Sequence, residues 1–153
     1  MSIKSLELYA KTIHLLSKLT DFDEAQLLEP IQVDKWSVRE IVGHLYYWDK
    51  FILEQQAPNM ANGAILPPFP DHDNHNQEAT KYIQRFESMD TLIDKFTETR
   101  KHLIDILSSK KDNINFTIGT GKRQFTVVSF LNIFIKHDAH HMKQINAYME
   151  LGH

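Results

Sequence analysis

The last part of the chain most constrains its fold, because a helical pattern from Thr126 to Glu150 carries two histidines on its inward side. Positions on this side recur at steps of four and three residues, the spacing of a helix face that packs against other helices. The face comprises Phe130, Phe134, His137, His141, Gln144 and Tyr148. His137 and His141 are one helical turn apart, so both imidazoles point inward. Because burying an unpaired polar ring is costly, each imidazole either has a hydrogen-bond partner or binds a metal ion.

Length and composition favour one ordinary globular domain over residues 1–153. Hydrophobic residues make up 42% of the chain and charged residues 24%. The net charge of −3 gives no basic surface for nucleic acid, and no apolar run is long enough to span a membrane. The absence of cysteine excludes disulfides, thiolate ligands and a cysteine nucleophile. Together with the lack of an apolar leader after Met1, it predicts a cytoplasmic protein.

Three further segments have helical periodicity, and the sequence therefore predicts an all-α fold, a four-helix bundle. These segments are residues 3–20, about 38–56 and 77–110. The second begins with a capping box, Ser37 to Glu40. The third has an irregular join near residues 88–90, with Asp90 as the expected cap of its second half. Thr126 is the expected N-cap of the last helix, and Gly152 its stop.

Two connections between these helices are long. Residues 57–76 contain most of the prolines and predict a long loop after the second helix. His72 and His75 lie in it beside two aspartates, and a solvated polar loop is favoured there over a metal cluster. Residues 113–126 alternate apolar and polar positions around a Gly-Thr-Gly turn, which predicts a short hairpin or an extended loop before the last helix.

A third inward imidazole comes from His44, which lies between Ile41 and Trp48 on the second helix. Metal sites in bundles are built from side chains of facing helices, and three neutral imidazoles suit zinc, nickel, copper or iron. A structural zinc site normally has a fourth protein ligand, often cysteine, so an open site is the better interpretation. From the residues alone, buried histidines that are hydrogen-bonded and hold no metal remain the alternative.

Other polar residues near the histidines have no clear role in the sequence. Asp49 and Asp138 are close in sequence to His44 and His137, but neither is favoured as a general base. His140 is rotated by about 100° from its neighbour His141, and a role beside the site, a dimer contact or plain surface exposure are all open.

Two motifs resemble those of the DinB/YfiT-like superfamily. The segment Trp36-Ser37-Val38-Arg39-Glu40-Ile41-Val42-Gly43-His44-Leu45 resembles the helix-two signature of that family. The segment His137-Asp138-Ala139-His140-His141-Met142-Lys143-Gln144-Ile145 resembles its helix-four signature, although Lys143 stands where members often have glycine. The resemblance implies a four-helix bundle of down-up-up-down topology, commonly a homodimer. It also implies one divalent metal ion per chain, held here by His44, His137 and His141.

The resemblance implies two possible enzymatic activities, and two non-enzymatic hypotheses also stay open. Some relatives look like metal-dependent hydrolases, and others transfer low-molecular-weight thiols such as bacillithiol or mycothiol. Thiol transfer is slightly favoured here, with zinc or nickel as the expected metal and iron or manganese as alternatives. The partner would be a small-molecule substrate. The other hypotheses are a non-catalytic, stress-associated metal-binding dimer and a bundle whose histidines hold no metal.

Overall fold

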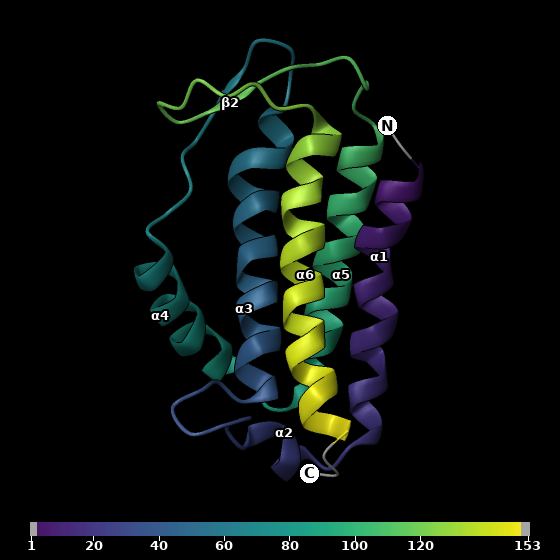
Figure 1. The fold of residues 1–153 in the computed structure, drawn as a ribbon, viewed down its shortest axis with the longest axis vertical. Coiled ribbons are helices and arrows are strands. Elements are labelled where there is room, and N and C mark those ends of the chain that lie inside the picture. Colours follow the sequence, from purple (N-terminus) through teal and green to yellow (C-terminus); the bar gives the residue numbers. More distant parts are fainter. Residues whose placement is uncertain (1–2, 151–153) are drawn as a thin grey trace.

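A computed structural model describes residues 3–150 as a bundle of four long helices with short elements at both ends and along one side (Figure 1). The long helices are α1 (Ile3–Ser17), α3 (Val38–Phe51), α5 (Met89–Ser108) and α6 (Val127–Glu150). The shorter elements are 3-10 turns at Lys18–Asp21, Ala57–Asn59 and Ile83–Arg85, a π-helical turn at Ile52–Gln56, helices α2 (Glu24–Leu28) and α4 (His72–Tyr82), and strands β1 (Ile65–Leu66) and β2 (Thr117–Ile118).

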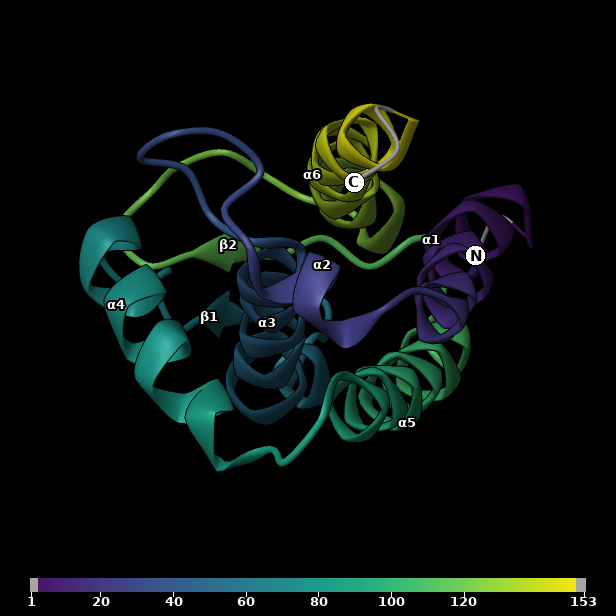
Figure 2. The same cartoon turned by 90° about the horizontal axis from the view of Figure 1, so that it is seen from below.

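The four long helices run down, up, up and down in chain order (Figure 1). Seen end-on, α1 and α3 occupy opposite corners of the bundle, and each packs against both α5 and α6 (Figure 2). The predicted four-helix bundle is therefore confirmed, with the topology that the family resemblance implied. None of the helices within residues 3–150 is long and apolar enough to cross a membrane.

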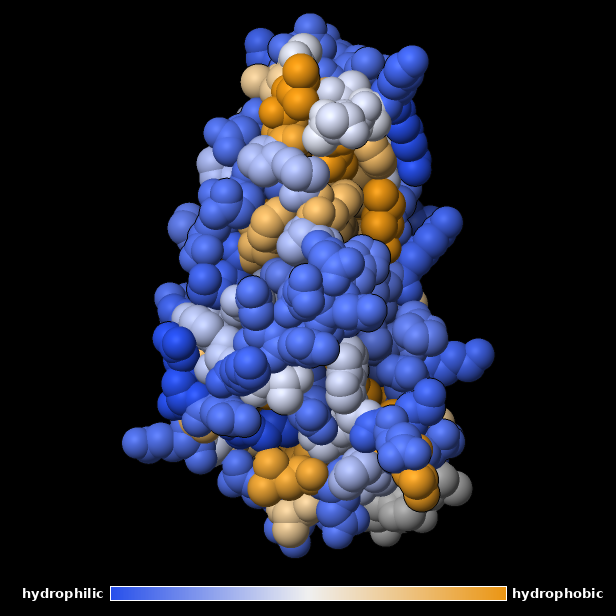
Figure 3. Space-filling model, turned by 90° about the vertical axis from the view of Figure 1, so that its left-hand side faces the viewer, coloured by the Kyte–Doolittle hydropathy of each residue, from blue (hydrophilic) through white to orange (hydrophobic). Residues whose placement is uncertain are grey.

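The parallel arrangement of α3 and α5 explains the long segment between them. After α3 the chain must run back along the whole bundle before α5 can begin at the end where α3 began. We call residues 52–88 the return segment. Helix α4 forms part of this return and lies outside the bundle against α3 (Figures 1 and 2). On the side of the molecule where α4 lies, the surface is mostly hydrophilic, with apolar areas toward the end at which β2 lies and smaller ones at the opposite end (Figure 3).

The sequence prediction for this return segment was partly wrong. The expected helix over 77–110 is two helices, α4 and α5, separated by the extended residue Phe86 and by Ser88. Ser88, and not Asp90, caps α5, because its side chain accepts a hydrogen bond from the Thr91 backbone N–H. Helix α4 also begins earlier than expected, and Asp71 is its N-cap. Its apolar pattern is weak, since only His75 and Ala79 are buried.

The other predicted helix starts are confirmed. The Ser37 hydroxyl accepts a hydrogen bond from the Glu40 backbone N–H at 3.1 Å, and the Glu40 carboxylate accepts one from the Ser37 N–H at 3.0 Å. Thr126 Oγ1 likewise accepts from the Ser129 backbone N–H at 3.1 Å. Each cap satisfies backbone donors that the helix itself leaves unpaired. The predicted stop at Gly152 lies outside the described residues.

The segment before α6, predicted as a short hairpin or an extended loop, is a loop closed by one antiparallel bridge. Phe116 and Phe125 exchange two backbone hydrogen bonds, of 3.0 and 2.8 Å, in an antiparallel bridge. The neighbouring strand β2 pairs in parallel with β1 from the return segment. That parallel pairing was not predicted, because the strands are two residues long and far apart in the chain. The two loops together close one end of the bundle.

A buried arginine on α5 ties the bundle together at its centre. Arg100 donates to both Asp49 oxygens on α3, from Nε at 2.7 Å and Nη2 at 2.9 Å. It also donates to both Asp138 oxygens on α6, from Nη1 at 2.6 Å and Nη2 at 3.2 Å. From α1, the Tyr9 carbonyl accepts from Nη1 at 2.9 Å, and the Thr12 hydroxyl donates to Asp138 at 2.9 Å. We call these five residues the Arg100 cluster; it joins all four long helices.

Loss of the guanidinium should strongly destabilise the bundle. Arg100 is 1% exposed, and its removal in Arg100→Met would leave two buried carboxylates without their counterion. Breaking a buried ion pair from one side typically costs about 3–5 kcal/mol. Urea unfolding followed by circular dichroism should show a loss of that size. The control is Lys95→Met on the same helix, whose ion pair with Glu98 is exposed and whose loss should change stability by less than about 0.5 kcal/mol. Equal losses would contradict this account of the cluster.

Candidate metal centre

The structure brings His44 of α3 together with His137 and His141 of α6. Each offers a ring nitrogen, and these nitrogens all lie within 4.8 Å of one another. The closest pair is His44 Nε2 and His137 Nε2, at 2.9 Å. Within residues 3–150, this is the only group of three or more histidine or carboxylate side chains with a spacing suited to one metal ion. The inward direction of all three imidazoles was predicted from helical spacing.

Two amide side chains orient these imidazoles. His44 Nδ1 lies 2.9 Å from Oδ1 of Asn76, on α4, and His141 Nδ1 lies 2.8 Å from Oε1 of Gln144. Because an amide oxygen only accepts hydrogen bonds, each Nδ1 carries the proton and donates it. The lone pair of each ring is then on Nε2, which is the arrangement of a metal-ligating imidazole with a supporting hydrogen bond.

Burial keeps the three imidazoles neutral. It lowers the pKa of His44 to about 3, with a further contribution from the neighbouring His137 and His141. It lowers the pKa of His137 to about 4, again reinforced by His141, and the pKa of His141 also falls mainly through burial. A neutral imidazole is the form that binds a metal, so at neutral pH protons do not compete for the site.

The donor set fits a divalent metal ion. Zinc–imidazole bonds of about 2.0–2.1 Å place two tetrahedral ligand nitrogens roughly 3.3 Å apart. The 2.9 Å between Nε2 of His44 and Nε2 of His137 is slightly shorter than that value, and all three nitrogens lie within 4.8 Å of one another, so their spacing suits ligands of one ion. Three imidazoles leave at least one coordination position without a protein ligand.

Trp36 packs on one side of the cluster, and another side faces a pocket. The Trp36 ring lies 4.9 Å from that of His44 and is stacked 6.3 Å from that of His141. On the other side, His44 and His137 contribute to the wall of a pocket of about 320 Å³, a size at the lower end for small-molecule sites. Its remaining lining residues are Trp48, Phe69, His72, Asn76, Ile133 and Phe134.

The other residues singled out in the sequence have different positions. Asp49 and Asp138 both bind Arg100 and not the histidines, in line with the expectation that neither is the general base. His140 is exposed, with its ring 5.1 Å from that of His141. His72 and His75 lie on α4 and not in a loop, so the prediction of a solvated loop was wrong there.

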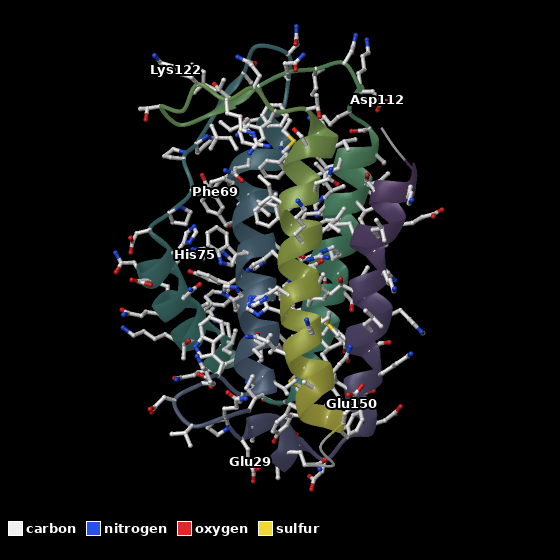
Figure 4. The ribbon with its side chains drawn as sticks, in the orientation of Figure 1. Glu29, Phe69, His75, Asp112, Lys122 and Glu150 are labelled. Atoms are coloured by element: carbon white, nitrogen blue, oxygen red, sulfur yellow. The ribbon has the colours of Figure 1, made fainter. Side chains whose placement is uncertain are left out.

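These two histidines of α4 have unequal environments. His75 is 5% exposed and packs 4.2 Å from the Trp48 ring, whereas His72 is exposed and lines the pocket. In Figure 4, Phe69 and His75, both in the segment between α3 and α5, lie beside α3. Sequence reasoning missed Asn76 and the pocket role of His72, because no helical pattern marked α4. It also missed the orienting role of Gln144, which the three-residue step from His141 could have suggested.

Comparison with known proteins identifies the family. A family model described as the DinB superfamily matches residues 7–145 of the chain. The chain belongs to the DinB superfamily. Among solved structures, YfiT from Bacillus subtilis matches with a TM-score of 0.69 and 17% identity, over 99% of this chain and 90% of that chain. YfiT is described as a probable metal-dependent hydrolase with an unusual four-helix bundle topology. This likeness shows that the two proteins share a fold. No curated protein matches the chain.

Metal binding by this DinB-superfamily chain should depend on each of the three histidines. Protein purified without an affinity tag is expected to contain about one divalent ion per chain. Elemental analysis should show that ion lost in His44→Ala, His137→Ala and His141→Ala while helical circular dichroism persists. The exposed His102 and His140 supply control variants that keep the metal. Full metal content in any of the three site variants would exclude that residue as an essential ligand.

The metal-free protein should lose stability as the pH falls from about 6.5 towards 4. Unfolded imidazoles take up protons below about pH 6.5, whereas folded His44 and His137 stay neutral to about pH 3 and 4. The unfolded chain therefore binds more protons in this window, and acid favours unfolding. Asp49 acts in the opposite sense, because burial raises its folded pKa to about 6, above the unfolded value, and so its contribution falls as the pH rises from about 4 to 6.

Urea unfolding of the metal-free protein at several pH values checks this expectation. The histidines outnumber Asp49, so the free energy of unfolding should fall by about 1–2 kcal/mol per pH unit on acidification. In His44→Gln the dependence should be weaker by about 1 kcal/mol per unit, because one titrating ring is gone. The same slope in both proteins would contradict the assignment.

Proposed function

We propose that the protein is a metal-dependent hydrolase that acts on a small molecule. The observation that carries the proposal is the position of the three-histidine cluster at the wall of a pocket, with two of its histidines lining that pocket. A metal that serves only structure is normally enclosed by four protein ligands. A cluster that is one ligand short and faces a substrate-sized space favours an enzyme over a non-catalytic metal-binding module.

Each residue of the site has a role in this proposal. His44, His137 and His141 would hold the ion, while Asn76 and Gln144 keep two of the rings in the ligating tautomer. Trp36 packs against the rings of His44 and His141 and would limit their movement. A divalent ion in such a site supplies an activated water and polarises the electrophile of the substrate. The pocket walls hold the substrate beside the cluster, which is the positioning that a hydrolytic reaction requires.

The likeness to YfiT supports hydrolysis as the reaction. YfiT has the same fold and is described as a probable metal-dependent hydrolase. Thiol transfer stays a second prediction, and no contact in the pocket favours it. In particular, a thiol cosubstrate that carries carboxylates would find no lysine or arginine among the eight lining residues. Zinc or nickel as the metal and a homodimer as the assembly also stay predictions.

Hydrolysis of a neutral ester tests the proposal. Zinc-loaded and nickel-loaded protein should cleave 4-nitrophenyl acetate, and removal of the metal by a chelator should lower the rate roughly tenfold or more. His141→Ala should behave like the chelated protein, because it removes a ligand, whereas His140→Ala should keep the wild-type rate. Release of 4-nitrophenolate measures the reaction.

A parallel assay distinguishes the two chemistries. Bacillithiol and a fluorogenic electrophile such as monochlorobimane are incubated with the same metal-loaded protein. Metal-dependent formation of the thiol adduct without ester cleavage would overturn the hydrolase proposal in favour of thiol transfer. If neither reaction depends on the metal, the non-catalytic module becomes the better account.

A further inference from the structure

Helix α4 gives the metal pocket two polar side chains from outside the bundle. His72 and Asn76 are one turn apart on α4 and both line the pocket. Asn76 already uses its amide oxygen to hold His44. His44 and His137 face the cluster itself. The polar side chains that line the pocket therefore divide into three that serve the metal site and one, His72, that does not.

His72 is placed to contact a bound molecule. Across residues 3–150 its side chain makes no hydrogen bond and no ion pair, although its ring packs edge-on against Trp48 at 5.4 Å. Packing against Trp48 fixes the ring beside the pocket while both of its nitrogens remain available. An imidazole can donate one hydrogen bond and accept another, so it can pair with a carbonyl, an amide or a hydroxyl group.

The remaining walls of the pocket are mainly aromatic. The Phe69 ring lies 6.1 Å from that of Trp48 and 6.0 Å from that of Phe134, and Trp48 and Phe134 are 6.5 Å apart. Ile133, which is 37% exposed, adds an aliphatic side. Ring centroids at 4.5–7 Å are the usual spacing of favourable aromatic pairs. A flat ring entering this space would meet several aromatic faces and edges at once.

The charges around the pocket disfavour ionic molecules. No lysine, arginine, aspartate or glutamate is among the eight lining residues, so a charged group would be desolvated there without a paired side chain. The divalent ion that the cluster is proposed to hold would attract an anion, but the anion would approach past Asp71 and Asp73, which flank His72 at the exposed start of α4, and would find no cationic side chain in the pocket. A cation would be repelled by the divalent ion that the cluster is proposed to hold.

We propose that this pocket binds a small uncharged molecule with an aromatic ring, and that His72 orients the molecule by hydrogen bonding to its polar group. The inference names the substrate class of the proposed hydrolase and to that extent rests on the proposed function. The binding itself requires no turnover. His72 acts in it as a specificity-determining residue, separate from the three histidines of the cluster.

Binding of four matched probes to the zinc-loaded protein tests the inference. Benzamide is neutral and aromatic, benzoate and benzylammonium carry the same ring with opposite charges, and cyclohexanecarboxamide keeps the amide without the aromatic ring. The chain has two tryptophans, and Trp48 lines the pocket, so its indole N–H signal in NMR reports occupancy. Comparison with Trp36→Phe assigns that signal. Benzamide should bind about five times or more tightly than each of the other three.

Variants of α4 test the part played by His72. His72→Ala should weaken benzamide binding about three- to tenfold, the effect of one hydrogen bond, without loss of zinc. His72→Gln should recover part of the affinity, since glutamine can still donate and accept. Asn74→Ala on the exposed side of the same helix is the matched control and should leave the affinity unchanged.

The outcomes of these measurements show whether the inference or the proposed function fails. Equal or tighter binding of benzoate, benzylammonium or cyclohexanecarboxamide would overturn the substrate class. Unchanged benzamide affinity in His72→Ala would overturn the role of His72. Ester cleavage by the zinc-loaded protein without benzamide binding would leave the hydrolase proposal standing and remove the inference. Selective benzamide binding that depends on His72, without ester cleavage, would support the inference and remove the hydrolase proposal.

Discussion

One buried arginine fixes the relation between the two helices that carry the three histidines. Asp138 directly follows His137 on α6, and Asp49 lies little more than one turn after His44 on α3. Arg100 on α5 binds both carboxylates. A slide of α3 or α6 that separated the imidazoles would therefore also break hydrogen bonds to a guanidinium that has no access to water. The geometry of the candidate metal centre depends on this contact.

The same cluster sets the charge beneath the histidines. In this cluster one guanidinium faces two carboxyl groups, so its acidic groups outnumber its single basic group. Burial opposes that charge and raises the pKa of Asp49 to about 6, although Arg100 attracts the ionised form. The histidines above are neutral, so the centre of the metal-free bundle carries no net positive charge that would repel a cation. This electrostatic environment is compatible with a dication between α3 and α6.

Helical periodicity and capping residues were enough to predict the bundle and the inward direction of the three imidazoles. Apolar burial determines both where the helices form and which of their sides face one another. The Arg100 cluster was not foreseen: an arginine between Thr99 and Lys101 on an amphipathic helix is normally exposed, and only its distant partners make burial possible. Helix α4 was also misjudged, since few of its side chains are buried. Tertiary contacts, and not local pattern, determine what Asn76 and His72 do.

The candidate site combines residues from two parts of the fold that are under different evolutionary constraints. These parts are the long bundle helices and the return segment between the parallel helices α3 and α5. The three histidines of the candidate metal centre stand on helices that the Arg100 cluster holds together, so changes near them would disturb the whole bundle. His72 lies on α4, outside the bundle, and does not hold any of the three histidines, unlike Asn76 on the same helix (Figure 2). A change at His72 that spares Asn76 could therefore alter which molecule is recognised without disturbing the histidine cluster, a division that would let one scaffold diversify its substrates.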